Sequence, residues 1–235
     1  TKGKYMNGGI YYFKSKIFKY IKNSKQSLEN DILPKLIEKK LIAAKVFKNF
    51  FLDIGSKKFI LSAAPKLKKN FLKKAIFLDR DGVINHDLGY VHKFKDFKFK
   101  NGVIKGLKYI AKKKYLIFIV TNQAGIAKGF FSEKDFFNLH LKLKKILSEK
   151  NIYIHDVLYS PFHPKGVIKK FKKNTNLRKP GNQMIEIIKK NWDINLKKSL
   201  MIGDRVTDKL AARKSKIKFF YSQKNFYKQI KILIN

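Results

Sequence analysis

The chain has 235 residues, of which 44% are hydrophobic and 14% aromatic, contains no cysteine and carries a formal net charge of +39. This length and apolar content suffice for one or two folded domains and exclude a disordered tail. The lack of cysteine excludes disulfides, thiolate zinc sites, iron–sulfur clusters and cysteine nucleophiles. No apolar run approaches the roughly 18 residues of a membrane span, and no signal peptide is visible, so we expect a cytoplasmic protein without a membrane partner.

The positive charge comes almost entirely from lysine, because only four of the 55 basic residues are arginine. Lysine is spread along the whole chain, together with many isoleucine, phenylalanine and asparagine residues, whose codons are rich in A and T. We interpret this composition as a coding bias that fills solvated faces with lysine; a polyanion-binding surface is the alternative. Since arginine is the usual bidentate reader of phosphates and bases, its rarity leads us to expect no nucleic-acid partner.

The first part of the chain, residues 1–64, mixes strand and helix patterns. We predict a glycine turn entering a strand over Tyr5–Phe13 and a second strand over Val46–Ile54. Between them, the pattern predicts a helix over Ser27–Lys39 that begins with a serine cap. The lysine-rich stretch 65–74 is the candidate linker. This part is therefore expected to be a small α+β segment.

From Ala75 onward, strand and helix patterns alternate. The predicted strands are Ala75–Leu78, Tyr115–Val120, Val157–Tyr159, Ser199–Ile202 and Ile217–Tyr221. The predicted helices are Val103–Lys113, Ser132–Lys150, Asn182–Asn191 and Val206–Lys214. This alternation is typical of an α/β fold in which helices flank a parallel sheet.

Polar side chains follow three of the predicted strands. Asp79 and Asp81 come after the first, Thr121 ends the second, and Asp204 follows a later one, while Lys179 precedes a helix. In a parallel sheet, ligands bind beyond the carboxyl ends of the strands. Each of these residues alone is typical of a solvated loop, a strand-end turn or a helix N-terminus. Their order and spacing together favour one common site.

The residue types in this site suit phosphoryl transfer. Asp79 can attack a phosphorus atom to form an aspartyl-phosphate, and Asp81 can protonate the leaving oxygen and later take a proton from water. Asp204 and Asp79 can together complete a site for Mg²⁺, a hard cation that prefers carboxylate oxygens. Thr121 and Lys179 can donate hydrogen bonds and charge to the transferring phosphoryl group.

Five segments carry a specific resemblance. They are Phe77–Asn85, Asp87–Val91, Val120–Gly129, Arg178–Pro180 and Ile202–Asp204. They resemble the D-glycero-D-manno-heptose 1,7-bisphosphate 7-phosphatase and histidinol-phosphatase branch of the haloacid-dehalogenase superfamily, over roughly Ala75 to Tyr221. The resemblance implies a Rossmann-like parallel sheet flanked by helices, without a large cap domain.

The resemblance also implies roles for single residues. Asp79 would be the nucleophile, Asp81 the general acid and base, and Thr121 and Lys179 the groups that stabilise the phosphoryl group. Mg²⁺ would take the Asp79 carboxylate, the Asp81 carbonyl and Asp204. The residues expected to contact substrate are Asp87, Leu88, Gly89, Tyr90, Asn122, Gln123, Ala124, Arg178 and Arg205.

The chain departs from this branch in one loop. Many heptose phosphatases carry a zinc loop with Cys-x-His and Cys-x-Cys, and Ser160, Phe162, Thr175 and Leu177 stand at the corresponding positions here. With no thiolate left, we predict no zinc. We expect His163 to be a hydrogen-bonding loop residue, and the loop 161–177 to be held by packing or to stay mobile.

The first part has a resemblance of its own. Met6–Tyr11, Ser27–Pro34 and Phe51–Gly55 are similar to the carboxyl-terminal portion of sugar-phosphate nucleotidyltransferases, whose glycine-rich nucleotide loop is missing. The resulting domain prediction is a nucleotidyltransferase-like segment over 1–64, a linker over 65–74 and a phosphatase domain over 75–235. The chain would then be part of a larger bifunctional guanylyltransferase–phosphatase, which favours the α-anomer of the bisphosphate; a packed appendage is the alternative.

The sequence therefore predicts an enzyme that acts on a phosphorylated sugar. The expected reaction is Mg²⁺-dependent removal of the 7-phosphate of D-glycero-D-manno-heptose 1,7-bisphosphate in heptose nucleotide-sugar biosynthesis. Three alternatives stay open: a histidinol-phosphate phosphatase, a nucleic-acid 3′-phosphatase and a non-catalytic binding module.

Overall fold

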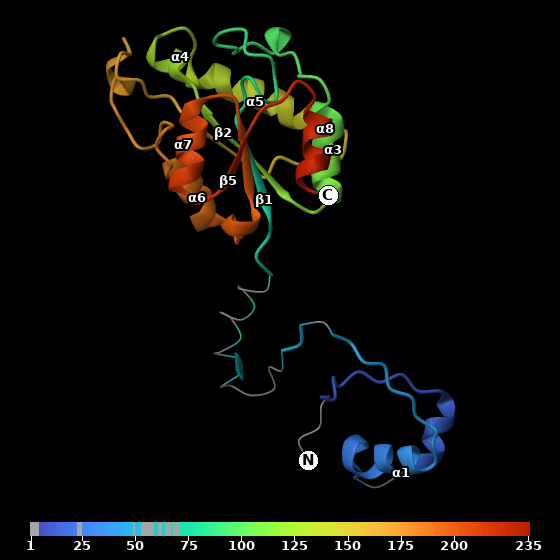
Figure 1. Cartoon of the computed structure of the whole chain (residues 1–235). Coiled ribbons are helices and arrows are strands. Elements are labelled where there is room, and N and C mark those ends of the chain that lie inside the picture. Colours follow the sequence, from blue (N-terminus) through green and yellow to red (C-terminus); the bar gives the residue numbers. More distant parts are fainter. Residues whose placement is uncertain are drawn as a thin grey trace. The chain divides into compact units, whose positions relative to one another are not determined.

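The computed structural model describes residues 5–22, 25–48, 50–52, 59–60, 63, 67 and 71–235. The chain divides into two compact units, Thr1–Asn70 and Phe71–Asn235 (Figure 1). The predicted segment Asp53-Ile54-Gly55 and half of the predicted linker 65–74 lie outside the described residues.

Three short helices of the first unit can be described over their whole range. They are the 3₁₀-helix η1 (Ser15–Tyr20), the π-helical turn η2 (Leu28–Ile32) and helix α1 (Leu33–Glu38). The helix predicted over 27–39 is confirmed, and Ser27 caps it by accepting the backbone N–H of Asn30 at 3.2 Å. A small apolar cluster around Ile32, Leu33 and Leu36 holds these turns together.

Both strands predicted for the first unit are wrong in the residues that can be described. Residues 5–13 form no strand, and neither do 46–48 or 50–52. Ile10 and Tyr12 leave 92% and 95% of their surface exposed, so no neighbouring element covers them. A strand needs a paired neighbour for its backbone, and an apolar alternation alone does not supply one.

The second unit contains a five-stranded parallel sheet, as predicted. Its strands are β1 (Ala75–Leu78), β2 (Leu116–Asn122), β3 (Asp156–Ser160), β4 (Leu200–Gly203) and β5 (Lys218–Tyr221). Their order is β3-β2-β1-β4-β5, and every pair is parallel. The central strand β1 is buried along its whole length, which explains its uninterrupted apolar sequence.

Helices cover both faces of this sheet (Figure 1). Helices α3 (Val103–Lys112), α5 (Glu133–Ser148) and α8 (Phe226–Leu233) pack with Ile76 and Leu78 of β1. Helices α6 (Gln183–Asn191) and α7 (Val206–Lys214) pack with Ala75 and Phe77 on the other face. The side chains of β1 thus alternate between two apolar cores.

The remaining helices are short. They are α4 (Ala124–Ala127) and the 3₁₀ turns η3 (Phe94–Asp96), η4 (Lys169–Phe171) and η5 (Leu196–Lys198). The sequence patterns did not predict α4 or α8. Among the described residues, no helix combines the length and the apolar character that a membrane span needs.

Candidate active site

A buried lysine lies between two aspartates at the carboxyl edge of the sheet. Asp79 directly follows β1, and its backbone N–H donates to the carbonyl of Ile202 in β4 at 3.0 Å. The Nζ of Lys179 lies 3.0 Å from Oδ1 of Asp79 and 2.6 Å from Oδ1 of Asp208, and it also donates to the carbonyl of Val120 at 2.8 Å. Only 2% of Lys179 is exposed, so these three oxygens take the place of its water.

Burial dominates the electrostatics of this group. It raises the pKa of Asp79 to about 7; Lys179 opposes the rise, and the charges of Asp208 and Asp81 add to it. Burial also raises the pKa of Asp204, again with Asp208 adding to the effect. For Lys179, burial lowers the pKa but the charges of Asp79 and Asp208 outweigh it, so the pKa is raised. One ammonium does not neutralise this many carboxylates, and a further cation would stabilise their ionised forms.

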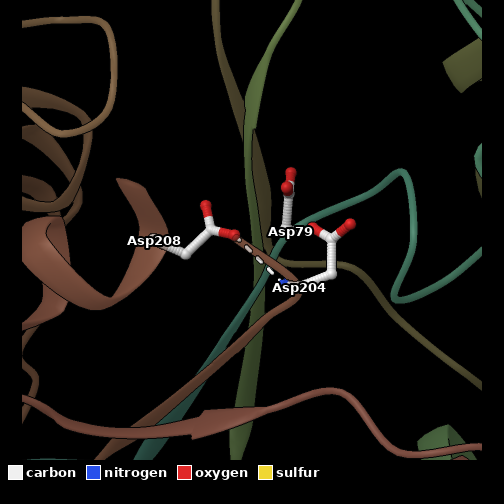
Figure 2. Close-up of side chains that lie close together, drawn as sticks. All are labelled: Asp79, Asp204 and Asp208. Carbon is white, nitrogen blue, oxygen red and sulfur yellow. Dashed lines mark hydrogen bonds between the residues drawn. The ribbon is translucent and has the colours of Figure 1, made fainter. Parts of the chain in front are cut away.

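Three carboxylates come close enough to share a cation. Asp79, Asp204 and Asp208 each offer an oxygen, and these oxygens lie within 4.8 Å of one another. Figure 2 shows them meeting at the ends of β1 and β4, with Asp208 bonded to the backbone of Asp204. Close approach here depends on Gly82, which has φ +77°, because a Cβ atom would lie 2.3 Å from Oδ2 of Asp204.

Asp204 and Asp208 have different surroundings. Oδ2 of Asp208 accepts the backbone N–H groups of Asp204 at 3.2 Å and Arg205 at 3.0 Å, while its Oδ1 faces Lys179. Oδ1 of Asp204 is buried and has no hydrogen-bond partner. The sequence prediction did not include Asp208 among the site residues, although two acids four residues apart at a helix start were a visible signal.

Asp81 is held by donors on both of its oxygens. Arg80 contacts both, and Asn85 donates to Oδ1 at 2.9 Å. Gln123 donates to Oδ2 at 3.1 Å and also to the hydroxyl of Thr121 at 2.9 Å. The predicted acid is therefore linked through Gln123 to the predicted phosphoryl-binding threonine.

These side chains surround a cleft of about 420 Å³. The predicted site residues that line it are Asp79, Asp81, Asp87, Gly89, Tyr90, Thr121, Asn122, Gln123, Ala124, Arg178, Lys179 and Arg205. Lys128, His163, Thr207 and Asp208 line it as well and were not predicted. Two predicted residues do not line it: Asp204, which belongs to the acidic cluster, and Leu88, which is 58% exposed.

An ion pair and a hydrogen bond join loops at the edge of the cleft. The guanidinium of Arg205 lies 2.8 Å from Oδ2 of Asp87, which joins the loop before α7 to the loop 87–90. The Nζ of Lys128 donates to the hydroxyl of Tyr90 at 2.7 Å. Residues 128 and 205 follow the second and fourth strands, so the loop 87–90 is held from two directions.

Asn122 lines the cleft and also contacts the backbone of Lys179. Its amide donates to the carbonyl of Lys179 and its oxygen accepts the N–H of Lys179, both at 3.0 Å. Asn122 therefore docks the backbone of Lys179 onto the end of β2. Arg178 next to it donates to the carbonyl of Phe162 at 3.3 Å.

Backbone hydrogen bonds join the loop 161–177 to α4. The N–H groups of Val167 and Ile168 donate to the carbonyl of Ala127 at 2.8 and 3.0 Å, and the rings of Phe162 and Phe171 lie 6.0 Å apart. His163 accepts a backbone N–H from Lys165 at 3.1 Å, in keeping with the predicted hydrogen-bonding role. The absence of zinc from this loop stays a prediction.

The chain is similar to known protein families over both units. The family described as "Polynucleotide kinase 3 phosphatase" matches residues 75–234, and the family "Nucleotidyl transferase" matches residues 1–70. A D-glycero-alpha-D-manno-heptose-1,7-bisphosphate 7-phosphatase of Photorhabdus laumondii is 42% identical over 135 residues, which cover 57% of this chain and 74% of that protein. A D-glycero-beta-D-manno-heptose-1,7-bisphosphate 7-phosphatase of Haemophilus influenzae is 40% identical over 147 residues, 63% of this chain and 79% of that protein.

The chain belongs to the family of these heptose 1,7-bisphosphate 7-phosphatases. Solved structures agree on the fold: a haloacid-dehalogenase-like phosphatase of Mesorhizobium loti matches 70% of this chain and 88% of that one with a TM-score of 0.61 at 23% identity. The heptose 1,7-bisphosphate phosphatase of B. bronchiseptica, solved with magnesium and phosphate, covers 68% of this chain and 86% of that one, with a TM-score of 0.58 at 23% identity. The family resemblance read from the sequence motifs is thereby confirmed.

Proposed function

We propose that this chain is a Mg²⁺-dependent phosphatase that removes the 7-phosphate of D-glycero-D-manno-heptose 1,7-bisphosphate through an aspartyl-phosphate intermediate. One observation carries the chemistry: the carboxylate of Asp79 lies on the cleft wall with the buried ammonium of Lys179 at 3.0 Å. The substrate is supported by relatives of about 40% identity that are named for it.

In the first half of the reaction, a carboxylate oxygen of Asp79 attacks phosphorus, and the bond between phosphorus and the sugar oxygen breaks. Asp81 gives its proton to that sugar oxygen, while the Lys179 ammonium offsets the charge on the phosphoryl oxygens and the Thr121 hydroxyl donates a hydrogen bond to them. In the second half, Asp81 takes a proton from water, the water oxygen attacks the phosphorus, and inorganic phosphate leaves Asp79. General acid–base catalysis of this kind contributes about 10²–10⁴-fold in rate.

The donor set fits Mg²⁺. Asp204 has a buried carboxylate oxygen without a hydrogen-bond partner, and Asp79 offers an oxygen nearby. Asp208 is occupied by Lys179 and two backbone N–H groups, so we assign Asp79 and Asp204, with the Asp81 carbonyl, as the ligands. When bound, Mg²⁺ supplies positive charge to the phosphoryl oxygens and to the ionised form of Asp79.

Phosphate release tests this proposal. Purified protein with Mg²⁺ is offered the α- and β-heptose 1,7-bisphosphates and histidinol phosphate, beside Asp79→Asn and the exposed control Asp96→Asn. We expect release from the heptose bisphosphates, with preference for the α-anomer, a loss of at least about 10³-fold in Asp79→Asn, and no change in Asp96→Asn. Release that survives Asp79→Asn, or none from either bisphosphate, would refute the proposal.

A nucleic-acid 3′-phosphatase is the second candidate, because the family that matches residues 75–234 is described by that activity. A 3′-phosphorylated oligonucleotide in the same assay decides between the two. Turnover of the oligonucleotide above that of the heptose bisphosphates, with strong inhibition by salt, would favour this candidate.

We also propose that residues 1–64 are the carboxyl-terminal part of a nucleotidyltransferase-like domain of a larger bifunctional chain, with 65–74 as linker and 75–235 as the phosphatase domain. The family match over residues 1–70 supports this division. Limited tryptic digestion is expected to leave a fragment that begins between Lys66 and Lys74 and keeps the phosphatase activity. First cleavage within 75–235 would contradict it. The cytoplasmic location stays a prediction.

A further inference from the structure

Arg80 is an unusual residue to find inside a protein core. It stands between Asp79 and Asp81, and it is the largest fully buried side chain among the described residues. Burying a guanidinium costs several kcal/mol unless charge and hydrogen bonds compensate, and apolar residues of similar volume often stabilise a fold better. The stability of the core alone therefore does not explain an arginine at this position.

The guanidinium is directed at the predicted acid. Its Nε lies 3.1 Å from Oδ1 of Asp81, and its Nη2 lies 2.9 Å from Oδ1 and 2.7 Å from Oδ2. Nη2 also donates to the carbonyl of Val91 at 2.7 Å. A planar fork of this kind fixes both the position and the plane of a carboxylate, which a lysine ammonium does not do.

Two further side chains donate hydrogen bonds to Asp81. Asn85 reaches Oδ1 at 2.9 Å and Gln123 reaches Oδ2 at 3.1 Å, so each oxygen has donors on the protein side. The Asp81 side chain keeps 20% of its surface exposed and lines the cleft. Its free rotation is thus restricted while one side stays open to the substrate.

We propose that Arg80 is a positioning residue that fixes the Asp81 carboxyl group beside the leaving oxygen: Oδ1 stays bound to Nε of Arg80 and to Asn85, and the transferred proton is carried on Oδ2. Through the carbonyl of Val91, it also ties Asp81 to the end of the substrate loop 87–90. The inference rests on the proposed phosphatase function. Misplacing a catalytic group by about 1 Å costs about 10²-fold in rate. A methionine in place of Arg80 removes the guanidinium contacts to both oxygens of Asp81.

A pair of aryl phosphates separates this role from a merely structural one. Phenyl phosphate and p-nitrophenyl phosphate differ in one nitro group, and phenolate, the more basic leaving group, depends more on protonation. We compare kcat/KM, which covers all steps up to departure of the leaving group, in wild type, Arg80→Met and Arg80→Lys. Arg213→Met, on the exposed side of α7, is the matched control.

The expected result is a loss of about 10²-fold on phenyl phosphate in Arg80→Met, against less than about tenfold on p-nitrophenyl phosphate. Arg80→Lys recovers part of the loss, and Arg213→Met changes neither rate. Equal losses on both substrates, or no loss, would overturn the inference, and so would a failure of both Arg80 variants to fold. If wild type itself shows no Asp79-dependent phosphate release, the proposed function fails instead.

Discussion

Replacing Lys179 with methionine probes the electrostatics of the site. The ammonium lies 3.0 Å from Asp79 and 2.6 Å from Asp208, and all three side chains are almost excluded from water. Methionine keeps the length of the side chain but leaves two buried carboxylates without their cation. Breaking a buried ion pair by removing one partner costs about 3–5 kcal/mol, a large part of the roughly 5–15 kcal/mol that stabilises a typical domain.

We therefore expect the free energy of unfolding of Lys179→Met to fall by about 3–5 kcal/mol at pH 7.5 in EDTA. The loss should shrink toward pH 5.5, because removal of Lys179 raises the pKa of Asp79 further above its buried value of about 7 and the carboxyl then takes up a proton. The double variant Lys179→Met/Asp208→Asn should regain part of the stability, since it removes one of the two unpaired charges.

Urea denaturation followed through the single tryptophan measures this directly. Trp192 follows α6 and its ring packs against Phe118 in the core, with ring centroids 5.5 Å apart. Lys189→Met is the matched control: Lys189 pairs with Glu186 at 3.2 Å on the surface, where such a pair contributes less than about 1 kcal/mol. If Lys179→Met loses no more stability than Lys189→Met, the buried ion-pair argument is wrong.

Three further outcomes follow from the site. Burial holds the pKa of Asp79 at about 7 against an ordinary value of 3.8, so the folded metal-free protein binds a proton that the unfolded chain has lost. Asp79 should then contribute a fall in the free energy of unfolding of up to about 1.4 kcal/mol per pH unit between about pH 4 and 7, opposite in sign to the contribution of buried His140, whose pKa is lowered to about 4. The test is the difference between urea titrations of wild type and Asp79→Asn in EDTA: identical pH dependences would contradict the raised pKa of Asp79. Gly82→Ala places a Cβ atom 2.3 Å from Oδ2 of Asp204 and should destabilise the protein by more than Gly89→Ala, which has the same φ of +77° but open space around it; equal melting temperatures would contradict the close approach. Arg205→Met breaks an exposed pair with Asp87 and should change stability by less than about 1 kcal/mol, yet raise the KM for heptose bisphosphate several-fold, so an unchanged KM would remove Arg205 from the substrate contacts.

The sheet could be predicted because each strand carries its own signal. Apolar runs such as Ala75–Leu78 are buried on both faces, and the polar residue that follows marks the carboxyl end. Helix α5 was equally clear, because Ser132 and Asp135 form a capping box with backbone bonds of 3.2 and 2.9 Å. Helix α8 was missed although Asn225 caps it and Phe226 and Ile230 face the core, since eight lysine-interrupted residues give a weak pattern.

The first unit shows the limit of such patterns. Tyr5–Phe13 reads as a strand, but pairing depends on a neighbour that the local sequence does not specify. Helix α1 could be predicted because the backbone hydrogen bonds of a helix form within the segment itself.

In the active site, the sequence prediction named Asp204 as a metal ligand and did not include Asp208, and the geometry supplies a physical reason for this difference. Asp204 and Asp208 are two acids on one loop and helix start, and either could have been the metal ligand. The structure places the carboxylate of Asp208 against Lys179 and two backbone N–H groups, whereas Asp204 keeps a buried oxygen without a partner. A carboxylate that is already paired with an ammonium is a poorer ligand for a second cation, so we infer that Asp208 serves as the partner of Lys179 and that Asp204 is the metal ligand. Asp208→Asn should therefore lower the free energy of unfolding in EDTA more than it lowers the free energy of Mg²⁺ binding. Asp204→Asn should lower the free energy of Mg²⁺ binding more than the free energy of unfolding.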